Sequence, residues 1–306
     1  MNNENRYDII IIGSGPAGYT AAVYAGRAGY TTVIFEKMSP GGQMGITSNI
    51  ENYPGLISVD GFTLADTMMK QAKKFGAVIK YEEAVSAVLD GEIKSVKTKK
   101  NEYYASAVII ASGARPRKLS IPGESELIGR GVSYCATCDG MFYKGKTVIV
   151  NGGGDTAIED ALYLSNICEK VIVVHRRNEF RASIYSVNKA RERDNIEFIT
   201  NSTVEEIVGQ SSVESVKIKN VITDEISLIP CDGLFVAIGR IPESEMFVGQ
   251  VETDNFGYIV AGDDCMTSLD GVYVAGDIRT KAVRQIVTAC ADGANAVKSA
   301  EKILNR

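Results

Sequence analysis

The chain has no excess of basic residues and no long apolar run. Its 306 residues include 33 lysines and arginines against 38 aspartates and glutamates, which gives a formal charge of -5 at pH 7. Proteins that bind the phosphate backbone of nucleic acid carry the opposite balance, so we expect no nucleic-acid partner. Because no apolar stretch approaches the roughly 18 residues that cross a bilayer, we expect no membrane segment either.

Cysteine and histidine are also scarce. Six scattered cysteines are too few for the disulfide framework of a small secreted protein. The polar N-terminus has no apolar region followed by a cleavage site, so it does not resemble an export signal, and we expect a cytoplasmic protein. The single histidine, His175, and one close cysteine pair, Cys135 and Cys138, do not complete a zinc site. We therefore expect no metal.

Glycine, in contrast, is abundant, with 30 residues that cluster in short runs. Residues 7–36 read as a buried strand, a glycine turn, a helix and a second strand. In the turn, Gly13, Gly15 and Gly18 form the pattern G-x-G-x-x-G, which lets a pyrophosphate approach the backbone at a helix N-terminus. Glu36 ends the second strand 18 residues beyond Gly18, where a carboxylate can bind ribose hydroxyls. This segment predicts a dinucleotide site.

Residues 146–177 repeat this plan about 140 residues later. The second glycine turn, G-x-G-x-x-A, comprises Gly152, Gly154 and Ala157. His175 stands 18 residues beyond Ala157, the position that corresponds to Glu36 in the first unit, and three arginines follow it. They are Arg176, Arg177 and Arg181. Guanidinium groups bind a 2'-phosphate, which a carboxylate would repel, so this unit favours NADP over NAD.

Two such units suggest one per domain, since about 306 residues allow roughly two domains. Proline-containing crossings at residues 112–118 and 237–244 each follow a buried strand, and only about 60 residues remain after the second. That remainder is too short for a domain of its own. We therefore expect residues 1–114 and 245–306 to form one α/β domain, with residues 115–244 inserted as a second.

A third motif is formed by Cys135, Cys138 and the adjoining Asp139. Two thiols at this spacing can close a small disulfide ring and exchange electrons with another disulfide. The neighbouring carboxyl can supply or take the proton that the exchange requires. The other four cysteines are isolated, and we interpret them as small buried apolar residues.

Two further segments indicate a flavin. Residues 36–43 begin at the ribose acid and supply a glycine turn and then Gln43, and Asn52 follows closely. Such amide groups can hydrogen-bond to a flavin ring. Near the C-terminus, a strand end and the start of a helix suit the ribityl and phosphate groups. These two places comprise Gly276, Asp277, Arg284, Gln285 and Ile286.

Together these motifs resemble those of the low-molecular-weight, bacterial-type thioredoxin reductases, a class II pyridine nucleotide-disulfide oxidoreductase family, over essentially the whole chain. The matching stretches are G-S-G-P-A-G from Gly13, G-G-Q-M-G-I-T-S-N-I-E-N-Y-P-G from Gly41, C-A-T-C-D-G from Cys135, G-G-G-D-T-A from Gly152, H-R-R-N-E-F-R-A from His175, and A-G-D-I-R with R-Q-I from Ala275. The resemblance implies a homodimer. Each subunit would have two Rossmann-like, three-layer domains, with the NADPH domain, which carries the dithiol, inserted into the FAD domain.

The same resemblance implies that electrons pass from NADPH to FAD and then to the disulfide through Cys138. Cys135 would attack the disulfide of thioredoxin, and Asp139 would be the acid or base. The implied FAD-binding residues are Gly13, Ser14, Gly15, Pro16, Ala17, Glu36, Lys37, Gly41, Gly42, Gln43, Asn52, Ala111, Gly113, Gly276, Asp277, Arg284, Gln285 and Ile286. The implied NADPH-binding residues are Gly152, Gly154, Asp155, Thr156, Ala157, His175, Arg176, Arg177 and Arg181.

Other functions remain open: a relative that takes electrons from ferredoxin, a flavin dithiol oxidase that uses oxygen, and a non-catalytic flavin-bound redox sensor. Some relatives that take electrons from ferredoxin lack the nicotinamide motifs, whereas this sequence has both the glycine turn and the arginine cluster. An oxidase would have little use for the arginine cluster. Two departures from the family's commoner residues, Ser112 and Thr156, keep both the hydroxyl and the approximate size. Reduction of thioredoxin is therefore the expected function.

Overall fold

The computed structural model describes residues 5–37, 40–47 and 50–305, which form two compact units. Unit 1 comprises Met1–Arg115 and Ile241–Arg306, and unit 2 comprises Pro116–Arg240. The second unit is thus inserted into the first. The boundaries expected from the crossings, after residues 114 and 244, lie within a few residues of these.

Unit 1 is built on a mixed sheet with the strand order β3-β2-β1-β6-β5-β4, in which β17 also pairs with β6. The strands are β1 (Arg6–Ile12), β2 (Thr32–Phe35), β3 (Val78–Lys80), β4 (Ala84–Val88), β5 (Lys94–Thr98), β6 (Glu102–Ile110) and β17 (Val272–Val274). Strands β1, β2, β3, β6 and β17 are parallel, whereas β5 pairs antiparallel with β6 and β4 pairs antiparallel with β5. Because β1 has β2 on one side and β6 on the other, its carboxyl end is a switch point, where α/β sheets bind ligands.

Both faces of this sheet are buried, as the isoleucine run in β1 requires. Side chains alternate between the two faces of a strand. Ile9 and Ile11 belong to the core under the helices, and Ile10 and Ile12 belong to a second core on the opposite face. All four are 5% exposed or less. A parallel strand covered on both faces reads as a continuous apolar run, which is why the periodicity of β1 shows no polar alternation.

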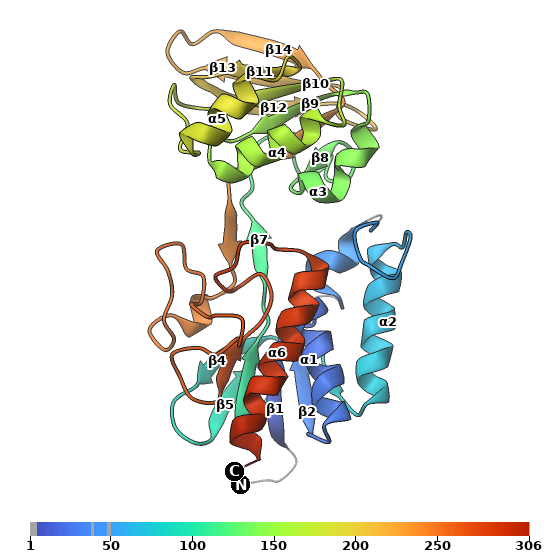
Figure 1. The fold of residues 1–306 in the computed structure, drawn as a ribbon, viewed down its shortest axis with the longest axis vertical. Helices are drawn as coiled ribbons and strands as arrows, with labels where there is room; N and C mark the ends of the chain where they lie inside the picture. Colours follow the sequence, from blue (N-terminus) through green and yellow to red (C-terminus); the bar gives the residue numbers. More distant parts are fainter. Residues whose placement is uncertain (1–4, 38–39, 48–49, 306) are drawn as a thin grey trace. The chain divides into compact units, whose positions relative to one another are not determined.

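Helices α1 (Pro16–Arg27), α2 (Gly61–Lys74) and α6 (Ile286–Leu304) contribute to the first of these cores, and α1 and α6 lie side by side (Figure 1). Gly293 permits their contact, because a Cβ there would lie 2.3 Å from the carbonyl oxygen of Ala17. Asp60 begins α2 by accepting the N–H of Thr63 at 2.9 Å. The short 3₁₀ helices of this unit are η2 (Gly42–Ile46) and η4 (Glu245–Phe247).

Unit 2 has a parallel sheet in the order β11-β10-β9-β15-β8 and an antiparallel sheet in the order β12-β13-β14. The strands are β8 (Val132–Ser133), β9 (Thr147–Asn151), β10 (Lys170–Val174), β11 (Ile196–Ile199), β12 (Ser202–Val208), β13 (Ser215–Asn220), β14 (Ile226–Pro230) and β15 (Gly233–Val236). The helices are α3 (Ala136–Asp139), α4 (Asp155–Ser165), α5 (Ile184–Arg191) and the 3₁₀ helix η3 (Gly140–Tyr143). Alternate residues of β9 again fill two cores, with Val148 and Val150 in one and Ile149 in the other.

Strands β7 (Ala114–Pro116) and β16 (Arg240–Pro242) pair as a two-stranded sheet where the chain passes between the units. Within the described ranges, no helix combines the length and the apolar character needed to cross a membrane. Each unit combines parallel strands with helices between them, and the predicted α/β fold class is confirmed.

Candidate functional site

The glycine turn of unit 1 lies at the carboxyl end of β1. Gly13 has a φ of +109°, and a Cβ there would lie 2.3 Å from the carbonyl oxygen of Ala111. A Cβ on Gly18 would lie 2.0 Å from the carbonyl oxygen of Gly13, whereas nothing lies within 4 Å of the Cβ position of Gly15. No side chain caps the first turn of α1, which begins at Pro16. Its N–H groups and the open space at Gly15 suit an anionic group.

Glu36 reaches this turn from the end of β2. Its side chain is buried, and Oε2 accepts hydrogen bonds from the N–H of Ser14 at 3.2 Å and from the Ser14 hydroxyl at 2.6 Å. The predicted ribose acid and the predicted phosphate turn are therefore adjacent in the structure.

The segment around η2 packs against the same turn. The N–H of Gly41 donates to the carbonyl oxygen of Ser14 at 3.1 Å. Gly41 and Gly42 both have a positive φ, +91° and +55°, which glycine adopts without steric cost. The side-chain amide of Gln43 donates to the carbonyl oxygen of Ala114. Three of the predicted flavin residues are thus held beside the end of β6 and the glycine turn.

Lys37 is directed elsewhere. Its Nζ lies 2.9 Å from Oε2 of Glu243, and the other oxygen of that carboxylate lies 2.9 Å from Nε of Arg115. The N–H of Glu243 in turn donates to the carbonyl oxygen of Gly113, which has a φ of +75°. Lys37 therefore takes part in an ion pair near the crossing between the units, and its contact with a cofactor remains a prediction.

Residues far apart in the sequence converge at the start of α6. Asn52 donates from Nδ2 to Oε1 of Gln285 at 3.1 Å, and Gln285 caps α6 in a reciprocal arrangement with Thr288. The guanidinium carbon of Arg284 lies 4.2 Å from the ring centre of Tyr258. Ile286 begins the helix. Asn52, predicted for the flavin ring, is thus hydrogen-bonded to Gln285, predicted for the ribityl and phosphate groups.

Gly276, which follows β17, also reaches the first turn of α1. It has a φ of +85°, and a Cβ there would lie 3.1 Å from Cβ of Ala17. The carbonyl oxygen of Asp277 accepts a hydrogen bond from Nε of Arg284 at 3.3 Å. The structure therefore brings the C-terminal flavin motif and the first glycine turn together in unit 1.

In unit 2, a disulfide joins Cys135 and Cys138, and α3 begins immediately after Cys135. The N–H of Asp139 donates to the carbonyl oxygen of Cys135 at 3.1 Å, and its Oδ2 accepts from the hydroxyl of Ser133 at 2.6 Å. Burial raises the pKa of Asp139, and the Ser133 hydrogen bond opposes this effect. A carboxyl group with a raised pKa holds its proton closer to neutral pH, so Asp139 is suited to proton transfer beside a dithiol.

In the glycine turn of unit 2, as in that of unit 1, one glycine has no room for a Cβ and another has open space beside it. A Cβ on Gly152 would lie 2.4 Å from the carbonyl oxygen of Ala237, whereas nothing lies within 4 Å of the Cβ position of Gly154. No side chain caps the first turn of α4. Asp155 accepts the N–H of Ser183 at 2.8 Å and so links the turn to the start of α5. The remaining predicted residues of the turn are Thr156, which is exposed, and Ala157, which is buried.

His175 lies beneath this turn and is 6% exposed. A Cβ on Gly153 would lie 2.2 Å from Nδ1 of the imidazole, which also stacks on Phe180 at 5.1 Å between ring centres. Its Nε2 lies 3.1 Å from the carbonyl oxygen of Glu179. Burial lowers the pKa of His175, and the neighbouring arginines act in the same direction. The neutral ring therefore supports the turn from below, and its direct contact with a cofactor remains a prediction.

Arg176, Arg177 and Arg181 are exposed. The main-chain N–H of Arg181 donates to the carbonyl oxygen of Gly153 at 2.7 Å, which holds this arginine at the glycine turn. Within residues 5–37, 40–47 and 50–305, none of the three guanidinium groups forms an ion pair with a carboxylate. The three cations are therefore available to a phosphate.

The described part of the chain holds no group of three or more histidine, cysteine, aspartate or glutamate side chains that could bind a metal ion. Cys168, Cys231 and Cys265 are free and buried, as predicted for the isolated cysteines, and Cys290 is partly buried. Burial raises the pKa of Cys168 to about 11 and that of Cys231 and of Cys265 to about 12.

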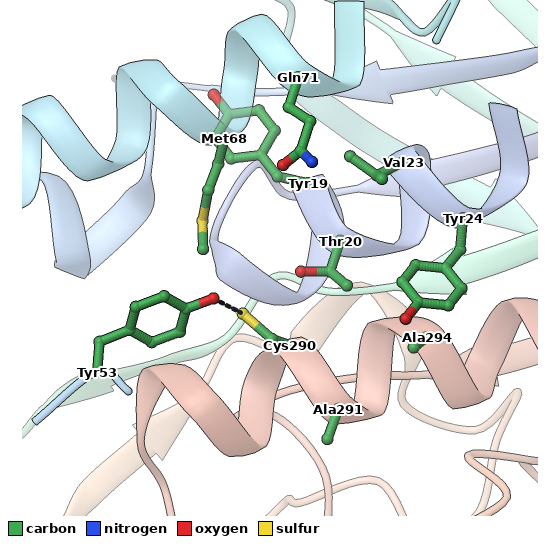
Figure 2. A pocket seen from close by; sticks show the side chains of 10 residues that line it. All are labelled: Tyr19, Thr20, Val23, Tyr24, Tyr53, Met68, Gln71, Cys290, Ala291 and Ala294. Carbon is green, nitrogen blue, oxygen red and sulfur yellow. Dashed lines mark hydrogen bonds between the residues drawn. The ribbon is translucent and has the colours of Figure 1, made fainter. Parts of the chain in front are cut away.

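A hollow of about 310 Å³ opens between α1, α2 and α6, and none of the residues that line it is a predicted site residue (Figure 2). The lining residues are Tyr19, Thr20, Val23, Tyr24, Tyr53, Met68, Gln71, Cys290, Ala291 and Ala294. In Figure 2 the hydroxyl of Tyr53 points toward the sulfur of Cys290, at 3.9 Å. Most of the lining is apolar or aromatic.

Two groups near the predicted sites were not identified from the sequence. One is Ser133, which contacts Asp139 and stands two residues before Cys135. The other is Asp292, whose carboxylate is buried in α6 and paired with Arg279 and Lys281. The available signal for Asp292 was a charged residue within an otherwise apolar helical stretch, since such a residue is buried only when it is paired.

Comparisons with known proteins identify the family of the chain. Residues 7–293 match the family described as pyridine nucleotide-disulphide oxidoreductase. A thioredoxin reductase of Peptoclostridium acidaminophilum is 47% identical over 306 residues, covering 98% of this chain and 97% of that protein. A bifunctional thioredoxin reductase/thioredoxin of Mycobacterium leprae is 46% identical over 305 residues, covering 99% of this chain and 67% of that protein.

Among solved structures, the crystal structure of thioredoxin reductase from Streptococcus pyogenes matches with a TM-score of 0.92 and 42% identity, covering 99% of each chain. The family predicted from the motifs is confirmed. The chain belongs to the pyridine nucleotide-disulphide oxidoreductase family, within its bacterial-type thioredoxin reductases.

Proposed function

We propose that the protein is an NADPH-dependent flavoprotein that reduces the disulfide of thioredoxin. The observation that carries the proposal is the disulfide between Cys135 and Cys138 beside the half-buried carboxyl group of Asp139. The chain also has two glycine turns that suit different nucleotides. One lies next to a carboxylate, which suits ribose hydroxyls, and the other lies next to arginines, which suit a 2'-phosphate. A thioredoxin reductase 47% identical over 306 residues supports this activity.

The described residues of unit 1 fit FAD. The open position at Gly15 and the uncapped start of α1 suit its pyrophosphate, and Glu36 beside them suits its ribose. The amides of Asn52, Gln285 and Gln43 suit its polar ring. When bound, FAD accepts hydride from NADPH and passes on an electron pair. Residues 1–114 and 245–306 are thereby assigned as the FAD domain.

Residues 115–244 are assigned to NADPH and to the dithiol. The open position at Gly154 suits the pyrophosphate, and Arg176, Arg177 and Arg181 suit the 2'-phosphate by charge-assisted hydrogen bonds. His175 supports the turn that presents them. These exposed arginines disfavour a ferredoxin-dependent reductase or an oxygen-using oxidase, because neither reaction needs a 2'-phosphate site.

Asp139 and the two cysteines carry out the exchange. Reduction of the Cys135–Cys138 disulfide by two electrons and two protons yields two thiols. Cys135 gives its proton to Asp139 and attacks one sulfur of the thioredoxin disulfide, and the departing sulfur takes the proton from Asp139. Cys138 then loses its proton in the same way and attacks the sulfur of Cys135. This step re-forms the enzyme disulfide and releases the second thioredoxin sulfur, which receives that proton.

The partner is a thioredoxin or thioredoxin-like protein, and the M. leprae relative, whose name joins both activities, supports this choice. The buried free thiols fit the cytoplasm, where cysteines stay reduced.

The proposal includes a homodimer whose interface is the face around the hollow between α1, α2 and α6. The mostly apolar and aromatic lining of this hollow and the 52% exposure of Tyr24 support the choice of face. Light scattering should give twice the subunit mass, and Tyr24→Glu should halve it. A monomeric native protein would contradict the assignment.

Steady-state oxidation of NADPH tests the activity. We expect rapid turnover with NADPH and oxidised thioredoxin together, and little turnover with oxygen alone, with NADH, or with Cys135→Ser. Equal turnover with oxygen alone would identify an oxidase. Turnover with reduced ferredoxin but not with NADPH would identify the ferredoxin-dependent alternative. A protein that binds FAD and NADPH but reduces no disulfide protein in a thioredoxin panel would be a sensor.

A further inference from the structure

The hydroxyl of Ser133 stands between the dithiol backbone and the carboxyl group of Asp139. Ser133 ends β8, and its side chain is almost fully buried. Its Oγ lies 2.6 Å from Oδ2 of Asp139, accepts the N–H of Cys135 at 3.1 Å, and lies 3.4 Å from the carbonyl oxygen of Cys135. The Ser133 hydroxyl can therefore donate its hydrogen either to Asp139 or to the carbonyl oxygen of Cys135, while it accepts the N–H of Cys135 in both cases.

A serine hydroxyl has one hydrogen to donate and two lone pairs to accept with. When Asp139 is ionised, the hydroxyl donates to Oδ2 at 2.6 Å. When Asp139 is protonated, its own O–H donates to Ser133, and the serine hydrogen turns to the carbonyl oxygen of Cys135 at 3.4 Å. The N–H of Cys135 donates to the same oxygen in both states. Both protonation states of Asp139 are thus hydrogen-bonded without any backbone movement.

No described cation assists this carboxyl group. The causes that shift the pKa of Asp139 are burial, which raises it, and the hydrogen bond from Ser133, which lowers it. The titratable groups nearby are Tyr143 on η3 and Tyr163 on α4, which packs against α3 next to Gly140. Cys135 and Cys138 titrate only after their disulfide is reduced. Burial, with a smaller contribution from the charge of Asp139, raises the pKa of Tyr143 to about 12. Ser133 is therefore the side chain that stabilises the ionised carboxylate.

We propose that Ser133 is a positioning residue for thiol–disulfide exchange, which acts through Asp139 by holding that carboxyl group beside the dithiol in both of its protonation states. The inference rests on the proposed function for the role of Asp139. It adds to that function a residue whose hydroxyl bonds to the carboxyl group of Asp139 and to the main chain of Cys135. Loss of the hydroxyl leaves burial unopposed, so Asp139 should keep its proton to a higher pH.

The test measures exchange between the Cys135–Cys138 pair of the FAD-loaded enzyme and dithiothreitol, from about pH 5 to pH 9. Asp139→Asn first identifies the inflection in the pH–rate profile that belongs to Asp139. In Ser133→Ala that inflection should move up by roughly one pH unit, the scale of losing one hydrogen bond to a charged group. Ser133→Thr, which retains the hydroxyl, should restore the native profile. Ser133→Ala should add nothing in the Asp139→Asn background.

An unchanged profile in Ser133→Ala, or an equal effect of Ser133→Ala with and without Asp139, would overturn the proposal. If Ser133→Ala does not fold, Ser133→Gly replaces it, with flavin absorbance and circular dichroism as checks on folding. Because dithiothreitol replaces both NADPH and thioredoxin, the profile is measured even if the proposed physiological substrates are wrong. That failure would appear separately, as absent NADPH oxidation.

Discussion

The main-chain N–H of Gly276 donates to Oδ2 of Asp292 at 2.9 Å. The same carboxylate pairs with Arg279 at 2.7 Å and with Lys281 at 2.6 Å, and all three side chains are 7% exposed or less. One residue of α6 thereby anchors the segment that carries the C-terminal flavin motif. Because a buried charge is stable only when paired, Asp292 is the main partner of both cations, although Arg279 also lies 3.5 Å from the exposed carboxylate of Asp263.

We expect Asp292→Asn to lower the free energy of unfolding by about 3 to 5 kcal/mol, the range for breaking a buried ion pair. It should also reduce FAD retention, because Gly276 loses a charged acceptor. Lys281→Met is the control, since it leaves a one-to-one pair between Asp292 and Arg279 and should cost less. Urea denaturation and the flavin-to-protein absorbance ratio measure both effects. Equal stability losses in the two variants would refute this reading of the cluster.

The same cluster predicts a pH dependence. Burial alone would raise the pKa of Asp292, but the hydrogen bonds from Arg279 and Lys281 bring it below its ordinary value. A depressed folded-state pKa contributes stability above the unfolded pKa of about 4, and this contribution is lost as pH falls through the folded pKa. Native protein should therefore lose more stability than Asp292→Asn on acidification below about pH 4. Parallel curves for the two proteins would contradict this assignment.

Replacing Arg176 and Arg181 with glutamine should reduce the preference for NADPH over NADH. Each charge-assisted hydrogen bond to the 2'-phosphate contributes roughly 1.5 to 3 kcal/mol, so the ratio of kcat/KM values should fall by at least tenfold. The value for NADH should change little. Arg193→Gln removes an exposed arginine outside the motif and is the matched control. Equal kcat/KM for both nucleotides in the native protein would rule out the 2'-phosphate assignment.

The order of the two cysteines can be read from trapped intermediates. With oxidised thioredoxin, reduced Cys138→Ser should accumulate a mixed disulfide through Cys135, because the resolving sulfur is missing. Cys135→Ser should accumulate none, and both variants should lose catalytic turnover. Non-reducing electrophoresis and mass spectrometry identify the adduct. A stable adduct only in Cys135→Ser would reverse the proposed roles.

Glu124 should be a strong determinant of stability in unit 2. Its carboxylate is 1% exposed and accepts the N–H groups of Leu119 and Ser120 and the hydroxyl of Tyr134, at 2.7 to 2.8 Å. Glu124→Gln should cost about 2 to 3 kcal/mol, because an amide cannot accept at both of its terminal atoms. Tyr134→Phe, which removes only the hydroxyl, should cost about 1 kcal/mol. A double-mutant cycle by urea denaturation should show coupling between the two residues, and additive effects would argue against it.

The parts of the site that could be predicted from the sequence depend on local geometry. Gly13 and Gly18 are predictable because a Cβ at either position would meet backbone atoms of the same motif or of the adjoining strand end. The acid at Glu36 follows because the length of one helix and one strand places it next to the turn. In these cases the spacing along the chain determines the spacing in the fold.

Other contacts depend on tertiary packing and leave little trace in spacing. His175 stands at the sequence position where a ribose-binding residue is expected. Whether its side chain points toward a cofactor depends on what packs against it, and in the structure Gly153 lies directly over the imidazole. Asn52 and Gln285 were both predicted, but their hydrogen bond joins segments that meet only through the packing of unit 1. The contact between Ser133 and Asp139 could not be predicted from their spacing either, because only the turn of α3 brings the carboxyl group of Asp139 back to Ser133.

The burial of Cys168, Cys231 and Cys265 also affects how readily the protein is oxidatively modified during catalysis. A disulfide reductase works among oxidants and mixed disulfides, and only thiolates react readily with either. At neutral pH, pKa values of about 11 for Cys168 and about 12 for Cys231 and Cys265 leave these sulfurs protonated. These three thiols should therefore not react with oxidants or mixed disulfides, and repeated turnover should leave them unmodified.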